Sequence, residues 1–207
     1  MIRATMILAA LLLAAGAEAQ IAHGNKDDNF RVFDAGVAIG TNFSQVHGDN
    51  LAGFNKIGFT GGVLTHINFD PNWSVGLEVN YSQKGSATFP DPNDPFEYKL
   101  SMQYAEIPVL VNYNDKNRLI FSAGMAYGRL FSVREVVNGN ETSNIADAIS
   151  NDELSFIMGG TILIGETRHF GANFRYQRSI TTVGESAQRN VPGLINVLLT
   201  LRGIYYF

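Results

Sequence analysis

The chain has no cysteine, few charges and no long apolar run after its first residues. Absence of Cys among 207 residues excludes a disulfide scaffold, a thiolate metal site and a cysteine nucleophile. Charged residues make up 16% of the chain, whereas an average protein has about 25%. A formal net charge of −4 with scattered Lys and Arg provides no basic surface for nucleic acid. We therefore expect no nucleic-acid partner.

The first residues have the three-part pattern of a secretory signal peptide. Arg3 provides a positive start, residues 6–15 are apolar, and Ala17-Glu18-Ala19 is a small-x-small cleavage site. The apolar run is shorter than the roughly 20 residues that a permanent membrane helix needs. We predict a cleaved signal peptide at 1–19, a flexible polar lead-in at 20–29 and a single domain at 30–207.

The remainder alternates apolar and polar residues with a period of two, which is typical of β-strands. Eight such segments occur, at 33–42, 57–69, 73–82, a stretch ending at 113, 119–128, 154–164, 170–177 and 196–207. Tight turns at 70–72, 114–117 and 166–169 alternate with long connections at about 44–56, 83–99, 134–153 and 181–194. This rhythm is typical of outer-membrane barrels, with short periplasmic turns and longer external loops.

One face of each segment is apolar, and the other is rich in glycine and small polar residues. Such a small-residue face fits the interior of an eight-stranded barrel, where only side chains fit. We therefore predict an all-β, eight-stranded antiparallel up-and-down transmembrane β-barrel in the outer membrane. Aromatic residues at both ends of the apolar face would form the girdles of such a barrel, namely Phe33, Phe69, Trp73, Tyr113, Tyr127, Tyr176 and Phe207. Outer-membrane lipid and the barrel assembly machinery, which reads a terminal aromatic strand, are the expected partners.

The predicted interior face carries a few polar and charged residues that are expected to satisfy one another. This interior polar network consists of His66, Glu78, Glu106, Arg175 and Arg202. Ser74, His66 and Glu78 share one face of a predicted hairpin, so a hydrolytic triad is an alternative. A filled lumen leaves no entry for a substrate, and we expect no enzyme activity and no cofactor.

An acidic cluster within residues 91–97 (Asp91, Asn93, Asp94 and Glu97) offers oxygen ligands for calcium, but without the spacing of an EF-hand. A solvated acidic loop is the preferred interpretation, so we predict no metal site. Over the nine residues 119–127 the outward face is uncharged, and Arg129 follows beyond Tyr127, where it could meet lipid phosphates.

The fourth segment has an irregular pattern. Its apolar residues are even-numbered up to Tyr104 and odd-numbered from Ile107. A change of face within one strand implies a β-bulge, which we expect near Ala105 and Glu106. Pro108 also removes one ladder donor there.

Four stretches resemble the PorT-like family of outer-membrane β-barrel proteins. They are residues 36–44 (GVAIGTNFS), 58–62 (GFTGG), 76–85 (GLEVNYSQKG) and 104–110 (YAEIPVL). The last stretch contains a Y-x-E-I-P pattern. The resemblance implies an outer-membrane barrel without shared catalytic residues. Some members of that family are linked to type IX secretion and gliding, which implies an envelope or secretion protein as a possible partner.

We therefore expect a structural or interaction protein of the cell envelope. The alternative is a soluble secreted barrel of lipocalin type, whose apolar face would line a ligand cavity. An enzyme acting on lipid would need His, Ser and carboxylate on the outward face, and none is expected there. A porin is disfavoured because eight strands leave no wide aqueous channel.

Overall fold

The computed structural model describes residues 31–48, 53–88, 97–115, 118–142, 149–184 and 193–207. The predicted signal peptide and lead-in lie outside these described residues. No helix in the described ranges is long and apolar enough to cross a membrane.

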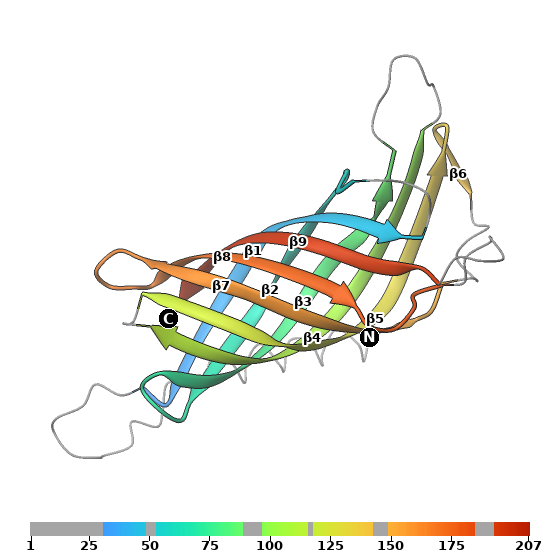
Figure 1. Ribbon diagram of the computed structural model, residues 1–207. Helices are drawn as coiled ribbons and strands as arrows, with labels where there is room; N and C mark the ends of the chain where they lie inside the picture. The colour runs from blue at the N-terminus through green and yellow to red at the C-terminus, as the bar shows by residue number, and fades with distance from the viewer. Residues whose placement is uncertain (1–30, 49–52, 89–96, 116–117, 143–148, 185–192) are drawn as a thin grey trace, which may run out of the picture. The chain divides into compact units, whose positions relative to one another are not determined.

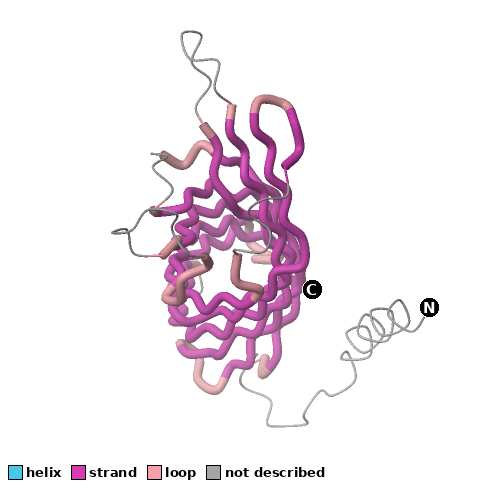
Figure 2. The backbone as a smooth tube through the Cα atoms, turned by 90° about the vertical axis from the view of Figure 1, so that its right-hand side faces the viewer, coloured by secondary structure: helices cyan, strands magenta, loops and turns pink. Residues whose placement is uncertain are grey.

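The chain from Arg31 to Phe207 forms one antiparallel sheet that closes on itself. Its strands are β1 (Phe33–His47), β2 (Lys56–Asn68), β3 (Trp73–Ala87), β4 (Tyr98–Asp115), β5 (Leu119–Val137), β6 (Asn140–Thr142), β7 (Asp152–Ile164), β8 (Phe170–Ser179) and β9 (Ile195–Tyr206). Neighbours in sequence pair throughout, apart from the short β6, and pairing of β1 with β9 completes the ring seen in Figure 2. The predicted eight-stranded antiparallel barrel is confirmed, with β6 as an additional short strand on β5.

Alternate residues of each strand point into and out of the barrel, as the sequence pattern predicts. The outward set is apolar and exposed, with Ile39 at 63% and Phe121 at 53% of their full accessible area. The inward set is small or polar and buried, for example Asn42, Asn80 and Asn173. The polar side chains therefore fill the interior, and the apolar side chains form the outer wall.

Inward glycines make room for the large interior side chains. A Cβ on Gly159 would lie 2.8 Å from Cγ of Arg175, and one on Gly40 would lie 2.9 Å from Cγ of Arg202. The added Cβ on Gly159 would also lie 2.5 Å from the carbonyl oxygen of Phe174. The added Cβ on Gly40 would lie 2.0 Å from the carbonyl oxygen of Leu201. Glycine at these positions therefore permits the arginines to lie across the lumen.

Several strands extend further toward the long loops than the sequence indicated. Pairing of β2 with β3 ends at Thr60 and Ser82, whereas β3 and β4 remain paired as far as Ala87 and Lys99. We call the extension, formed by residues 83–87, 98–103, 131–137 and β6, the projecting wall. Figure 1 shows it rising beyond the rest of the barrel. The predicted connections at 83–99 and 134–153 are therefore partly wrong, because much of them is strand.

The predicted change of face in β4 is wrong. Even-numbered residues of β4 are buried from Leu100 to Asn112, on both sides of Ala105. The register shift lies in the pairing of β4 with β5, where Gln103 pairs with Ser132 and Tyr104 with Leu130. Phe131 is thus the extra residue, and the bulge is on β5. Beyond it, odd-numbered Glu135 is buried.

One tight hairpin was not predicted from the sequence. Val137 pairs with Asn140 across Asn138 and Gly139, which have φ angles of 50° and 78°. Two successive positive φ values in a two-residue loop are typical of a type I′ turn, for which Asn-Gly is the preferred pair. The Asn138-Gly139 dipeptide therefore predicts the turn that connects β5 to β6.

Candidate functional site: the barrel interior

A first cluster of buried charges centres on Glu78 of β3. Arg175 donates from Nη1 to Oε2 at 2.9 Å and from Nη2 to Oε1 at 2.5 Å, which is a bidentate pair. Arg202 donates from Nη1 to Oε2 at 3.0 Å, and Asn80 donates to the same oxygen at 2.9 Å. The carboxylate therefore has all of its hydrogen bonds supplied by β3, β8 and β9.

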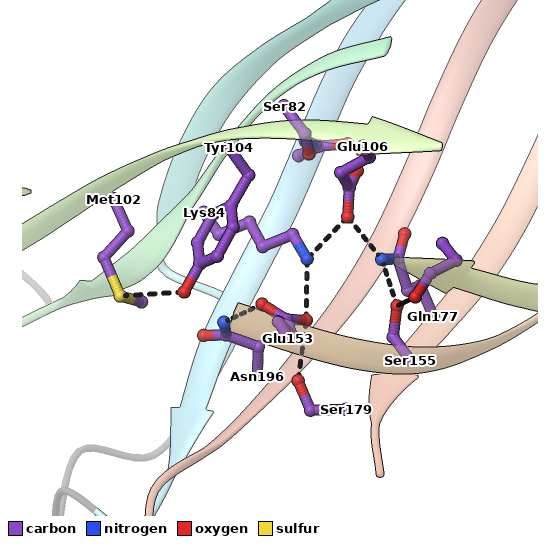
Figure 3. Close-up of polar contacts among 12 residues, drawn as sticks. Ser82, Lys84, Met102, Tyr104, Glu106, Glu153, Ser155, Gln177, Ser179 and Asn196 are labelled. Carbon is purple, nitrogen blue, oxygen red and sulfur yellow. Dashed lines mark hydrogen bonds and ion pairs between the residues drawn. The ribbon is translucent and has the colours of Figure 1, made fainter. Parts of the chain in front are cut away.

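A second cluster centres on Lys84, also on β3, and is shown in Figure 3. Its Nζ atom lies 2.7 Å from Oε1 of Glu106 and 2.7 Å from Oε1 of Glu153. The ammonium group also lies 4.7 Å from the ring centroid of Tyr104. Ser179 and Asn196 donate to the Glu153 carboxylate at 2.7 and 2.8 Å. The fully buried cation is thereby enclosed by two carboxylates and a ring face.

The two clusters have opposite charge excess. The first places two guanidinium groups around one carboxylate, and the second places two carboxylates around one ammonium group. Buried ions are costly unless they are paired and hydrogen-bonded, so this balance is what makes a charged lumen tolerable.

Neutral side chains fill the space between the clusters. Gln177 donates to Glu106 at 2.7 Å and to Ser155 at 2.8 Å, and Thr200 donates to Asn42 at 2.7 Å. A small cavity lined by Asn80, Gln177, Arg202 and their neighbours has room for about one water molecule. Among the described residues, the interior is a packed polar core with space for about one water molecule.

Apolar clusters pack inside the barrel toward both ends of this core. At the loop end, an apolar plug is formed by Val46, Leu100, Met102, Tyr104, Leu130 and Ile149. Val183 is 1% exposed, and its backbone bonds to Ser150 and Leu194 hold the loop segments across this end. At the turn end, Ala38, Leu64, Ile204 and Tyr206 pack together. The plug at the loop end explains the misread pattern of β4, whose inward residues there are apolar.

Four of the five residues of the predicted interior network take part in the two clusters. Glu78, Arg175 and Arg202 form the first, and Glu106 joins the second. His66 lies toward the turn end with its ring centroid 5.7 Å from that of Tyr206. All five side chains are buried.

The alternative hydrolytic triad does not assemble. In the described part of the chain, no hydrogen bond joins His66 to Ser74 or Glu78. Ser74 instead accepts a hydrogen bond from Asn112 at 3.2 Å, and Glu78 is occupied by the two arginines.

Sequence reasoning missed Lys84 and Glu153, because both were assigned to long connections. The signal was present for Lys84, since the alternation of small polar residues in β3 continues through Ser82 to Ser86. Glu153 precedes Ser155 on the inward side of β7, so extending that segment by one inward position would have found it.

The residues predicted for the aromatic girdles lie on the outward face near strand ends. Phe33, Phe69, Trp73, Tyr113, Tyr127 and Phe207 are all exposed, and Tyr176 is half-buried. Trp73 and Tyr113 contact each other edge to face, with ring centroids 5.0 Å apart. Arg129 is outward as expected, but Asp152 already binds its guanidinium at 2.7 and 2.8 Å.

Asp91, Asn93 and Asp94 of the predicted acidic loop lie outside the described residues. Within the described ranges, no group of His, Asp and Glu has an arrangement that could hold a metal ion.

Comparison with known proteins identifies the family. A family model described as "outer membrane protein beta-barrel domain" matches residues 18–184. The chain belongs to this family. It is therefore an outer-membrane β-barrel protein, and the soluble lipocalin-like alternative is not favoured. We found no match among curated proteins.

Solved structures share the fold at low sequence identity. The attachment invasion locus protein Ail of Yersinia pestis is 15% identical, with a TM-score of 0.52 over 86% of this chain and 100% of that chain. The same protein in complex with the heparin analogue sucrose octasulfate gives 12% identity and a TM-score of 0.50, with the same coverage. Neisserial surface protein A gives 12% identity and a TM-score of 0.49, over 86% of this chain and 98% of that chain.

Proposed function

We propose that this protein is a structural or interaction protein of the cell envelope, and neither an enzyme nor a channel. Its working surface is the projecting wall at the loop end. In outer-membrane barrels the short turns face the periplasm and the longer connections face the outside. On that rule the projecting wall extends outward from the cell.

The length of the projecting wall carries this proposal. The outward face of β4 is apolar from Tyr113 to Ile107 and becomes polar from Gln103 to Lys99. Residues 98–103 therefore continue beyond the apolar band, over about 20 Å of strand at about 3.4 Å per residue. A membrane span does not need this extension, so we assign it to contact with a partner.

The sealed interior supports the rest of the proposal. Paired charges and two apolar clusters fill the lumen, which disfavours conduction. The residues of the candidate triad are engaged elsewhere, which disfavours hydrolysis in the lumen.

Export and assembly complete the proposal. The pattern of residues 1–19 supports transport by a cleaved signal peptide, followed by insertion by the barrel assembly machinery. Resemblance to the PorT-like family supports an envelope or secretion protein, of type IX kind, as the partner.

Site-specific photo-crosslinking in intact cells tests where a partner binds. A crosslinking residue replaces Asn140 in the projecting wall, or Thr167 in the turn at the opposite end. We expect protein adducts from position 140. Ile39, exposed in the apolar band, is the matched control and is expected to give lipid adducts only. Protein adducts from position 167 alone, or from neither end, would contradict the proposal.

A further inference from the structure

A single arginine interrupts the apolar outer surface of β8 at the loop end. Arg178 is exposed, and the residues before and after it on the same face are Tyr176 and Ile180. Its partners on the neighbouring strands are Phe156 and Val197. Apolar or aromatic side chains therefore surround the guanidinium position on all four sides.

This arginine lacks the counter-ion that its counterpart on β5 has. Arg129 lies two residues beyond Tyr127, as Arg178 lies two residues beyond Tyr176. Asp152 binds Arg129 through both carboxylate oxygens. Among the described residues, Arg178 has neither an ion pair nor a hydrogen bond. This guanidinium at the edge of the apolar band is therefore available to an anion that the described residues do not supply.

Two further polar side chains lie on the same outward face, two strands away from Arg178. Val197 pairs with Arg178 on one side and with Gln45 on the other, so Gln45 is about 10 Å from Arg178 at twice the strand spacing. His47 follows on the same outward face of β1. Neither side chain has a hydrogen-bond partner among the described residues. Figure 1 shows β8, β9 and β1 side by side.

We propose that Arg178, Gln45 and His47 form a binding site for the phosphate group of an outer-leaflet lipid. The guanidinium supplies parallel N–H donors that match a phosphate, and the two neighbours add donors at its edge. Tyr176 marks the membrane interface, where lipid phosphates lie. On the membrane side of Arg178, the outward pair of Tyr176 and Leu199 faces the upper acyl chain. This inference rests on the outward orientation of the loop end stated above.

Binding of bis-phosphorylated lipid A to the full chain, refolded in detergent, tests this site. We expect Arg178→Gln to weaken binding about tenfold or more, as the loss of a charge-assisted bidentate contact implies. Arg178→Lys, which keeps the charge but not the planar donors, is expected to lose less. Arg168→Gln removes an exposed arginine at the turn end and is the matched control, with unchanged binding expected.

Two ligand comparisons separate a lipid site from a general anion site. Lipid A without phosphates is expected to bind wild type as weakly as phosphorylated lipid A binds the Arg178→Gln variant. Inorganic phosphate is expected not to compete. Equal binding by wild type and Arg178→Gln, or displacement by inorganic phosphate, would overturn the proposal. The assay contains no protein partner, so its failure is distinguishable from failure of the crosslinking experiment.

Discussion

Lys84 is the residue on which the interior charge balance depends most. It is fully buried and is the only cation that the described residues place between Glu106 and Glu153. Removing one member of a buried ionic group leaves the others uncompensated, which costs more than the group contributes when intact.

We expect Lys84→Met, which keeps the length of the side chain, to destabilise the barrel by about 3–5 kcal/mol. Urea unfolding in lipid vesicles measures this change. The triple variant Lys84→Met, Glu106→Gln, Glu153→Gln removes all three charges and is expected to recover most of the loss. A triple variant as unstable as the single one would show that packing, and not charge, holds this cluster.

Two adjacent glycines on β7, Gly159 and Gly160, allow a matched comparison of how tightly the side chains in the lumen are packed. A Cβ on Gly159 meets the Phe174 carbonyl oxygen at 2.5 Å, whereas one on Gly160 has its nearest contact at 3.7 Å. We expect Gly159→Ala to destabilise the barrel by about 1–3 kcal/mol through overpacking. Gly160→Ala is expected to change stability by less than about 0.5 kcal/mol. Equal effects in urea unfolding would contradict the tight fit beside Arg175.

The β4 and β5 strands show how far alternation alone can predict such a structure. A period of two located all eight barrel strands, because one face of each contacts lipid. It failed in β4, where the inward residues Leu100 and Met102 are apolar as well. Once both faces are apolar, the pattern no longer indicates which side is inside. The bulge at Phe131 was equally hidden, since register is a property of two strands and not of one.

The interior network was predictable in part for a related reason. Glu78 and Arg175 lie on segments whose alternation is clear, so their inward direction could be read. Their pairing could not, because they are 97 residues apart and meet only when the ring closes.

The Asn138-Gly139 turn determines whether β6 forms at the tip of the projecting wall. Gly139 has a φ angle of 78°, which a β-branched residue adopts only at a cost of about 1–3 kcal/mol. We expect Gly139→Val to open this hairpin and to speed hydrogen exchange of the Val137 and Asn140 amides. Asn138→Gly, which suits a positive φ, is the control and is expected to preserve protection. Protection that persists in Gly139→Val would rule out the proposed turn.

As a whole, the described part of the chain from Arg31 onward is a barrel with an apolar outer wall and a lumen filled by side chains. The two charge clusters lie between an apolar cluster toward the loop end and another toward the turn end, and further polar and charged side chains, including Asp34 and Lys56, lie on the inward face. Among the described residues, the side chains that pair and pack inside the ring therefore also fill it.

The central claim is that this closed lumen does not conduct. Single-channel recording of the refolded protein in a planar lipid bilayer tests it most directly. A gel of boiled and unboiled samples from the same preparation confirms that the barrel is folded. We predict that the folded protein produces no current above that of the bare bilayer. Stable conductance steps from a preparation that shows the folded band would contradict the account.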